Sequence, residues 1–523
     1  MRHIIILIYA WLIELHRKPL MLSNFTIRFI YIPGINKIRT FNSKARAYSE
    51  FIKAKRRVPA YKSFLKAHNF SKPSFSGLLP NIHEIPEIDK ENYIKKFSID
   101  ARCIGGKIPI KNIIIDESSG SSGTATNWVR GLKERKRNAK MIEFGMRTLV
   151  GKEPLFVINA FALGPWATGV NVTMSCVSFS KLKSLGPEKE KIENTLKQFG
   201  KNHNYVIMGY PPFLKYLVDN SEIEWDKFNI AFIFGGESMS EGMRDYLFQK
   251  GIKKAYSSLG ASDLELNISA ENDFTISLRR LLRSNQSLQS KILKHTGALP
   301  MIFQYNPTDF LIESSEAGEL IVTIGRPDYI APKIRYNIHD RGHTLSLKDL
   351  YSILKSLNIS LDKLAKPQTD LPLLLHYGRA DMTVSFFGAN ISPTDVNEVI
   401  YSLPELSKIV NSYNLSIDED NEGAKKLIVS IEVQKGETIE LLDLEKTQVS
   451  FFENLSKINQ DFKGEDVVFI AVLNGSFMFA ADLMKSVNLP SEISFVKMSS
   501  YYGTESSGRV DELIGLSNDV KGK

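Results

Sequence analysis

Hydroxyl-bearing residues and glycines alternate over a short segment that follows an apolar run. The run is Ile113–Ile115, and the segment is Ser118, Ser119, Gly120, Ser121, Ser122, Gly123 and Thr124. Glycines let several backbone N–H groups face one anion, and the hydroxyls add donors that do not titrate. A strand followed by such a loop suits nucleotide phosphates, so the segment points to ATP. No Gly-Lys-Ser/Thr follows at the spacing of a Walker A loop.

A flexible Gly/Ser linker is the competing interpretation of this segment. Three neighbours argue against it: the preceding apolar run, the acidic pair Asp116-Glu117, and the stretch Trp128-Val129-Arg130. A strand on one side and apolar and basic residues on the other are not typical of a flexible linker. We therefore expect a structured phosphate loop.

Length and composition indicate a soluble protein of two or three domains. The chain has 523 residues, of which 43% are hydrophobic and 24% charged, which is ordinary for globular proteins. Its two cysteines, Cys103 and Cys176, are far apart, so neither a disulfide framework nor a cysteine zinc site is supported. A reducing, cytoplasmic setting fits this cysteine usage best.

The positive charge is concentrated at the N-terminus. Residues 1–70 contain 14 Lys and Arg against only Glu14 and Glu50, although the whole chain carries +9. We favour a solvated helix face here over contact with nucleic acid or an anionic membrane. The apolar stretch Ile4–Ile13 is shorter than the roughly 20 residues that span a bilayer, so we expect a buried or peripheral helix.

Strand-length apolar runs alternate with longer mixed segments from about Lys111 to Ile324, which predicts α/β architecture. The predicted strands are 155–158, 205–208, 230–234 and 320–324, and the predicted helices are 187–199 and 241–250. Sites in such folds gather at the carboxyl ends of strands. A domain boundary is expected at Gly378, where a hinge would let a small lid move over a larger body.

Four segments in order resemble the adenylate-forming superfamily, most closely its phenylacetate-CoA ligase branch. They are Ser118–Thr126, Leu259–Asp263, Tyr336–Asp340, and Gly378–Asp381 continuing to Pro393. The resemblance covers about residues 45–460. It implies an α/β fold with a basic helical segment (1–70), a large multi-sheet ATP-binding domain (71–378) and a small α+β lid domain (379–456).

The resemblance implies ATP-binding roles for residues around the adenine and the phosphates. Ser118–Thr124 would surround the β- and γ-phosphates, and Gly260, Ala261 and Ser262 would border the adenine and the acyl carboxylate. Gly236 and Glu237 resemble a turn near the adenine. Asp263 stands where the family usually has the Glu that holds Mg²⁺, and because Asp is one methylene shorter, the metal geometry is expected to differ. A helix cap is the alternative role of Asp263.

The same resemblance gives roles to three residues near the hinge. Asp340 matches the aspartate that accepts hydrogen bonds from both ribose hydroxyls, which suits an acceptor-only carboxylate. Arg379 would contact the ribose or a phosphate, and Asp381 matches the hinge residue of the lid. The residues with an expected catalytic role are Asp263, Arg379 and Asp381. Pairing of Asp340 with Arg341, and an ordinary surface Arg379/Asp381 pair, are the alternatives.

The resemblance implies attack of a carboxylic acid on the α-phosphorus of ATP, followed by transfer of the acyl group to CoA or to a carrier-protein thiol. Mg²⁺ and the phosphate loop would offset the developing charge. The lid lysine of the family has no match after Val429, so impaired turnover is expected. The acid and the oligomeric state are not fixed by the sequence.

Residues 457–523 instead resemble hypoxanthine phosphoribosyltransferase, through Val467–Leu483 and Ser499–Tyr501. Leu473, Asn474 and Gly475 would form a pyrophosphate loop, and Ser500 and Tyr501 would belong to a mobile loop. The acidic ribose-phosphate segment and the purine-binding segment have no match, so this tail is expected to be a partial α/β domain. A purine phosphoribosyltransferase and a non-catalytic nucleotide-binding protein are therefore the alternative functions.

Overall fold

The computed structural model describes residues 2–118, 125–265, 267–294 and 299–379, and after these the segments 384–386, 389–391, 397, 400–401, 404–419, 425–433, 467–473, 491–502 and 505–514. The chain divides into two compact units. The first comprises Met1–Met239, Leu247–Lys294 and Leu299–Ala380, and the second comprises Ser240–Tyr246, His295–Ala298 and Asp381–Lys523. The predicted domain boundaries at residues 70, 378 and 456 stay predictions.

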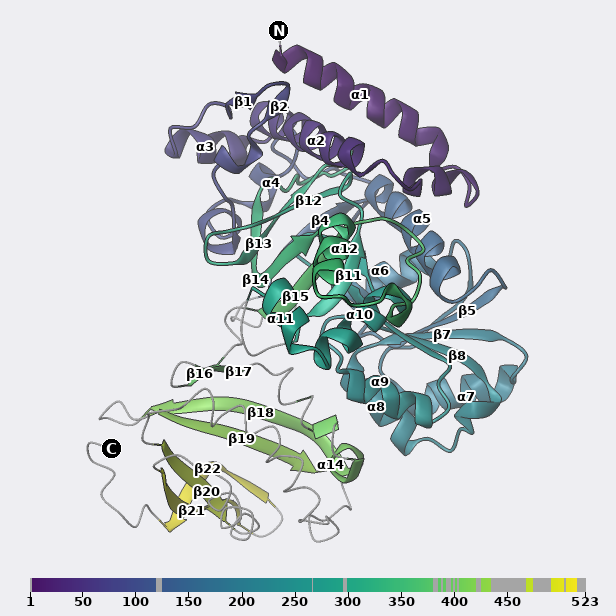
Figure 1. The fold of residues 1–523 in the computed structure, drawn as a ribbon, viewed down its shortest axis with the longest axis vertical. Helices are drawn as coiled ribbons and strands as arrows, with labels where there is room; N and C mark the ends of the chain where they lie inside the picture. Colours follow the sequence, from purple (N-terminus) through teal and green to yellow (C-terminus); the bar gives the residue numbers. More distant parts are fainter. Residues whose placement is uncertain are drawn as a thin grey trace. The chain divides into compact units, whose positions relative to one another are not determined.

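The first unit is built around an 11-stranded sheet of order β12-β13-β14-β15-β11-β10-β9-β8-β7-β5-β6 (Figure 1). Two-stranded sheets β1-β2 and β3-β4 accompany it. The strands are β1 (Phe75–Ser76), β2 (Leu79–Pro80), β3 (Ile113–Glu117), β4 (Asn127–Gly131), β5 (Leu155–Asn159), β6 (Lys181–Ser184), β7 (Asn204–Gly209), β8 (Asn229–Phe234), β9 (Lys254–Leu259), β10 (Ser269–Ala270), β11 (Met301–Tyr305), β12 (Phe310–Ser314), β13 (Glu319–Ile324), β14 (Tyr336–Leu345) and β15 (Leu373–Arg379).

Helices precede and connect these strands. They are α1 (Arg2–Leu20), α2 (Asn36–Arg57), α3 (Pro59–Ala67), α4 (Ile99–Arg102), α5 (Leu132–Leu149), α6 (Ala167–Cys176), α7 (Lys189–Phe199), α8 (Pro211–Asn220), α9 (Glu241–Gln249), α10 (Asp273–Arg283), α11 (Gln286–Ile292) and α12 (Leu347–Ser356). Shorter helical turns are η1 (Thr26–Tyr31), η2 (Ile82–Glu84), η3 (Lys90–Ile94), η4 (Trp225–Lys227) and η5 (Leu361–Lys363).

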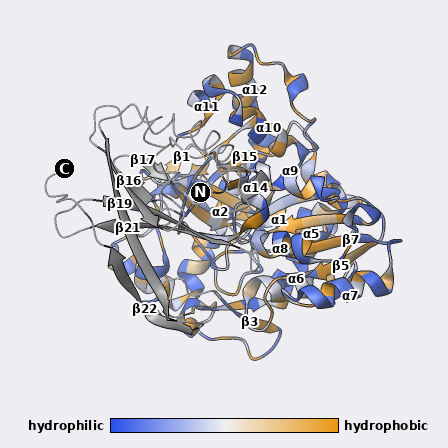
Figure 2. Cartoon of the chain, turned by 90° about the horizontal axis from the view of Figure 1, so that it is seen from below, coloured by the Kyte–Doolittle hydropathy of each residue, from blue (hydrophilic) through white to orange (hydrophobic). Residues whose placement is uncertain are grey.

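One part of the large sheet is parallel. Strands β6, β5, β7, β8 and β9 pair in parallel, and β5 is buried at all five positions. Strands buried on both faces are continuous apolar runs, because each crossover places a helix over a face of the sheet. Figure 2 shows this hydrophobic colouring along β5 and β7, beside the more hydrophilic α7. The carboxyl ends of these strands therefore meet at one edge.

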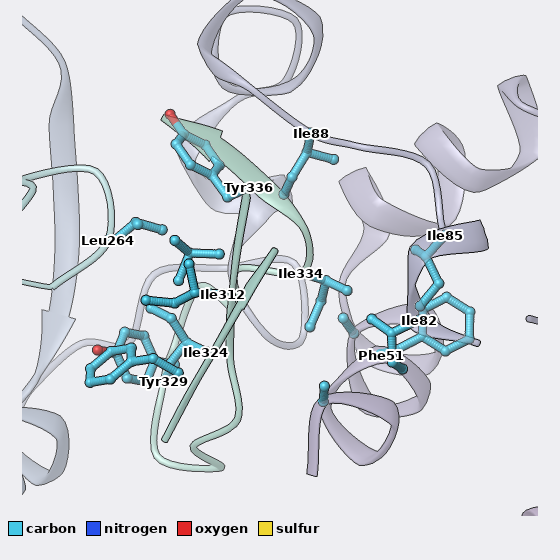
Figure 3. Packing of buried hydrophobic residues seen from close by; sticks show 14 of the residues in the cluster. Phe51, Ile82, Ile85, Ile88, Leu264, Ile312, Ile324, Tyr329, Ile334 and Tyr336 are labelled. Atoms are coloured by element: carbon cyan, nitrogen blue, oxygen red, sulfur yellow. The ribbon is translucent and has the colours of Figure 1, made fainter. Parts of the chain in front are cut away.

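The other part of the sheet is antiparallel and packs on the N-terminal helices. β10 to β15 pair antiparallel, and β14 pairs with both β13 and β15. Figure 3 shows the core that results, in which Phe51, Ile82 and Ile85 lie on the helical side and Ile312 and Ile324 lie on the strand side. This core holds the start of β14 in place.

Helix α1 is fixed to the body of the first unit. Tyr9 donates a hydrogen bond of 2.8 Å to Asn42 of α2. Arg17 donates two hydrogen bonds to the buried carboxylate of Asp309, at 2.9 and 2.8 Å. Bidentate geometry makes such a pair specific as well as strong. The expected N-terminal helix is therefore present, with one face buried.

The second unit contains short sheets. They are β16 (Val384–Phe386) with β17 (Ala389–Ile391), β18 (Val410–Glu419) with β19 (Lys425–Val433), and β20 (Val467–Leu473), β21 (Ser491–Tyr502) and β22 (Glu505–Ile514) in one three-stranded sheet; α14 is Pro404–Ile409. β20 and β21 are parallel. Within the described residues, no helix has the length and hydropathy needed to cross a membrane.

The predicted α/β class is confirmed. The four predicted strands correspond to β5, β7, β8 and β13, and the predicted helices correspond to α7 and α9. Each observed strand is longer than the predicted one by at most one residue at either end, because flanking polar residues such as Asn204 and Asn229 also pair in the sheet.

Candidate functional site

Ser118 lies at the end of a hairpin formed by β3 and β4. Its N–H donates to the Thr126 carbonyl at 3.0 Å, and its hydroxyl accepts from the Thr126 N–H at 3.3 Å. The strand predicted before the phosphate loop is therefore present, and Ser118 is buried where the hairpin ends. The other predicted loop residues, Ser119 to Thr124, lie outside the described residues.

Buried charges hold the base of this hairpin. The Asp116 carboxylate accepts a hydrogen bond from Arg135 and lies 3.8 Å from Arg130 Nε. Arg130 also pairs with Glu134 at 3.3 Å, and burial raises the pKa of Glu134 to about 7 against the opposing charge of Arg130. Buried charges are tolerated only when they are paired and hydrogen-bonded. The hairpin therefore has a rigid base.

Arg130 also connects the hairpin to the turn after β9, which contains the predicted residues Gly260, Ala261, Ser262 and Asp263. Its guanidinium donates to the Leu264 carbonyl at 2.6 Å and to the Ser262 carbonyl. One side chain thus ties the base of the predicted phosphate loop to the predicted adenine and metal turn. Guanidinium suits this task because it has five donors in a fixed plane.

Asp263 joins that turn to β14. Its Oδ2 accepts a hydrogen bond of 2.5 Å from the Tyr336 hydroxyl. The alternative role as a helix cap is wrong, because the next helix, α10, begins at Asp273 and is capped by Asn272. A single carboxylate is compatible with Mg²⁺, which keeps several waters and binds substrate phosphates alongside one or two carboxylates. Clusters of three or more metal-ligating side chains are absent among the described residues.

Lys333 lies beside this pair. Its ammonium is 4.2 Å from the centre of the Trp128 ring and 4.9 Å from that of Tyr336. Burial, the charge of Arg130 and the charge of Arg102 hold the pKa of Lys333 well below its usual value, while Asp263 opposes them. The Lys333 amine near the predicted metal ligand is therefore easier to deprotonate than an ordinary lysine.

Asp340 and Arg379 face each other across neighbouring strands. They are register partners in the antiparallel pair β14-β15, so the structure brings these two predicted ligands together. The Asp340 Oδ2 also lies 2.9 Å from His376 Nε2, two ladder positions away. Asp340 thus pairs with His376 rather than with Arg341. The predicted hinge residue Asp381 lies outside the described residues.

Gly236 follows the carboxyl end of β8 in a conformation that favours glycine. Its φ is +87°, and a Cβ here would lie 2.3 Å from the Tyr210 ring. Tyr210 packs edge-to-face on Phe161, with ring centres 5.0 Å apart. The predicted turn is therefore closely packed against the aromatic residues at the strand ends, whereas the side chain of the neighbouring Glu237 is exposed.

Three residues of this arrangement were not among the predicted site residues. Arg130, Lys333 and His376 act through contacts between segments that are distant in sequence, so spacing gives no signal for them. Tyr336 belongs to the Tyr336–Asp340 motif, but its bond to Asp263 depends on how β14 approaches the turn after β9.

The predicted phosphoribosyltransferase residues fall at strand ends of the second unit. Leu473 ends β20, and Ser500 and Tyr501 lie near the end of β21. Asn474 and Gly475 lie outside the described residues. The parallel pairing of β20 with β21 is in register from Val467 to Leu473.

Solved structures of acid-CoA ligases share this fold. The chain is similar to a 2-hydroxyisobutyryl-CoA ligase in the postadenylation state in complex with R3-HIB-AMP, with a TM-score of 0.58, 12% identity, and coverage of 89% of this chain and 88% of that one. The same ligase with 2-HIB-AMP and CoA in the thioesterification state gives a TM-score of 0.52 at 12% identity, covering 91% and 90%. The predicted resemblance to adenylate-forming ligases is confirmed at the level of the fold.

A second similarity concerns a short segment of sequence. Hypoxanthine phosphoribosyltransferase of Haemophilus influenzae is 41% identical over 71 residues, which are 13% of this chain and 39% of that protein. Hypoxanthine-guanine phosphoribosyltransferase of Staphylococcus epidermidis is 40% identical over 67 residues, 13% of this chain and 37% of that protein. The chain thus spans about two-fifths of these curated relatives. No protein-family model matches the chain.

Proposed function

We propose that the protein activates a carboxylic acid with ATP, forming an acyl-adenylate and pyrophosphate, and transfers the acyl group to CoA. The observation that carries this proposal is the pairing of Asp340 with Arg379 across β14 and β15, in a fold shared with acid-CoA ligases. An acceptor-only carboxylate with an arginine at the opposite register position suits a ribose and a phosphate on one nucleotide.

The contacts around Asp263 support a place for the metal and the triphosphate. Arg130 holds the 262–264 turn to the β3-β4 hairpin, and Tyr336 holds Asp263 to β14. Asp263, with waters and phosphate oxygens, would hold Mg²⁺, which supplies charge neutralisation at the transferring phosphorus. Gly260–Ser262 would border the adenine, and Ser118 begins the loop for the phosphates.

Pyrophosphate exchange tests the first half-reaction. Labelled pyrophosphate should enter ATP in the presence of one acid from a panel of aryl and short-chain acids, and the exchange should require Mg²⁺. The lid lysine has no counterpart in the sequence, so slow exchange is expected, because a missing electrostatic group costs about 10²–10³ in rate. Binding of AMP without exchange for any acid would instead support a non-catalytic nucleotide-binding protein.

A second candidate function rests on the similarity to hypoxanthine phosphoribosyltransferases over about 70 residues. That similarity covers 39% of the curated relative, and we expect this portion by itself to form no inosine monophosphate from hypoxanthine and phosphoribosyl pyrophosphate. Its formation in a chromatographic assay would make the phosphoribosyltransferase the better description.

A further inference from the structure

Helix α1 has two apolar faces, and only one of them is covered. Ile6, Ala10, Ile13 and Arg17 recur at helical spacing and are buried. Figure 1 shows α1 running along the outside of α2, so this face is directed toward the body. The other face is also apolar and is exposed, through Ile4, Ile5, Ile8, Trp11, Leu12 and Leu15.

The exposed apolar surface continues past the end of α1. Leu22 is 77% exposed and Phe25 70% exposed, and Phe29 and Ile32 are exposed after them. We call these four residues and the six exposed residues of α1 the N-terminal apolar surface. With Ile38, they account for 11 of the 19 large hydrophobic side chains that are exposed within the described part of the chain. Contiguous apolar patches of this kind mark interaction sites on proteins.

The exposed charges within this segment have one sign. The exposed charged residues between positions 2 and 40 are Arg2, Lys18, Arg28 and Lys37, and none of the exposed residues there is acidic. The single acidic residue of this stretch, Glu14, is half-buried and pairs with Arg46 at 3.1 Å and with Arg137 at 2.9 Å. The segment therefore presents apolar and aromatic side chains together with exposed charges that are all basic.

We propose that the N-terminal apolar surface binds an anionic lipid bilayer, with α1 lying in the plane of the interface. Helices with exposed Trp, Phe and Leu side chains and basic flanks bind in this way, because burial of apolar area adds to attraction by anionic headgroups. A protein partner with an ordinary mixture of surface charges would not explain why the exposed charged residues of this segment are all basic. Among the described helices, α1 included, none is long and apolar enough to cross a membrane.

The surface is formed before any lipid is bound. The two hydrogen bonds from Arg17 to Asp309 and the bond from Tyr9 to Asn42 hold α1 in a fixed orientation. The exposed face therefore does not need to fold on binding, which lowers the entropy cost of association.

Flotation of the full chain with lipid vesicles tests the proposal. We expect the protein to float with vesicles of phosphatidylcholine containing one third phosphatidylserine, and to float weakly with phosphatidylcholine alone. The fluorescence of Trp11, 62% exposed, should shift to shorter wavelength on adding anionic vesicles. The substitution Trp11→Phe should abolish this shift and leave flotation largely unchanged.

Two variants with matched controls separate the contributions. The double substitution Trp11→Ser, Phe25→Ser should lower vesicle affinity at least tenfold, whereas Ile110→Ser, at another fully exposed apolar residue, should not change it. The double substitution Lys18→Gln, Arg28→Gln should lower affinity about fivefold per charge for anionic vesicles alone. Lys107→Gln, which removes an exposed charge elsewhere, should have no effect.

Two experimental outcomes would contradict lipid binding by the N-terminal apolar surface. Unchanged flotation of Trp11→Ser, Phe25→Ser, with thermal unfolding like that of the parent, overturns the proposal. Sedimentation equilibrium that shows a dimer lost in this variant, together with no flotation of the parent, assigns the surface to a second copy of the chain and also overturns it. These results do not depend on ATP or on any acid, so they are independent of the proposed ligase activity.

Discussion

The Tyr336 hydroxyl donates to Asp263 at 2.5 Å, which fixes the turn after β9 against the start of β14. Both residues of this hydrogen bond are close to predicted ligands. Asp263 is the predicted metal ligand, and Tyr336 lies four residues before Asp340 in β14. Removing the hydroxyl by Tyr336→Phe should therefore lower pyrophosphate exchange about tenfold and lower the free energy of unfolding by about 1 kcal/mol. Exchange assays and urea denaturation measure the two effects.

The matched control for this substitution is Tyr61→Phe. Tyr61 is buried in the same core, but its hydroxyl has no hydrogen-bond partner among the described residues. Its removal should leave exchange unchanged and leave stability unchanged or slightly higher. Equal loss of exchange in both variants would mean that the bond to Asp263 has no role in the site.

The substitution Asp340→Asn should weaken AMP binding. An amide offers one acceptor oxygen where the carboxylate offers two, and the substitution removes the negative charge that lies beside His376 and that, in the proposed function, accepts from the ribose hydroxyls. We expect the dissociation constant for AMP to rise about 10- to 100-fold, as for a lost hydrogen bond to a charged group. Isothermal titration calorimetry measures it.

The exposed Asp349, which accepts a hydrogen bond from the capping Ser346 of α12, provides the control for Asp340. Asp349→Asn makes the same chemical change at an exposed position outside the predicted site and should leave AMP binding unchanged. An Asp340→Asn variant that binds AMP as tightly as the parent would remove the ribose assignment.

The apolar strands could be predicted from the sequence, whereas the site strand β14 could not. A run such as 230–234 is buried on both faces, so its composition alone marks β8. β14 contains Asn337, His339 and Asp340, and its polar composition is typical of a loop. It is a strand because β13 and β15 supply hydrogen bonds on both sides, which is a tertiary effect.

The contacts that organise the candidate site depend on the same kind of long-range pairing. Arg130 meets Ser262 and Leu264 across more than 130 positions, and Tyr336 meets Asp263 across 73. The sequence does place Asp263, Asp340 and Arg379 in motifs, because those positions resemble a known family. The side chains that hold these residues in place, such as Arg130, belong to no such motif, so only the three-dimensional structure identifies them.

Gly236 should tolerate a side chain poorly. Its φ of +87° favours glycine, and an added Cβ would lie 2.3 Å from the Tyr210 ring. The substitution Gly236→Ala should lower the free energy of unfolding by roughly 2 kcal/mol, from backbone strain and the clash together. Urea denaturation measures the loss.

A double-mutant cycle with Tyr210→Ala separates the two causes of this loss. Removing the ring relieves the clash but not the backbone strain, so Gly236→Ala should cost about half as much in the Tyr210→Ala background. Full additivity of the two substitutions would show that the ring does not restrict this turn.

The pair between Arg17 and Asp309 should make stability depend on pH. Burial alone raises the pKa of the Asp309 carboxyl, but the charges of Arg17, Arg137 and Arg46 outweigh it and hold the pKa well below its usual value. Because the folded-state pKa is depressed, the stabilisation is present above the ordinary carboxyl pKa of about 4 and is lost as pH falls below it. The parent protein should therefore lose stability steeply on acidification.

The substitution Asp309→Asn leaves the buried Arg17 and Arg46 and the half-buried Arg137 without this counter-charge, so it should cost about 3–5 kcal/mol at neutral pH. The difference from the parent should narrow as pH falls below about 4, because the unfolded parent then takes up a proton on this carboxyl while the folded parent keeps it ionised. Urea denaturation from pH 3 to 7 measures both curves, with Asp362→Asn, at an exposed carboxylate, as the control. A constant difference in the free energy of unfolding between parent and Asp309→Asn over this range would mean that Asp309 is not the group whose ionisation holds α1 to the body.

The substitution Asp309→Asn should also weaken lipid binding. It loosens α1, and the fixed orientation of α1 holds the N-terminal apolar surface ready for the bilayer. Vesicle flotation of this variant measures the effect, and unchanged flotation would mean that the fixed orientation does not contribute to lipid binding.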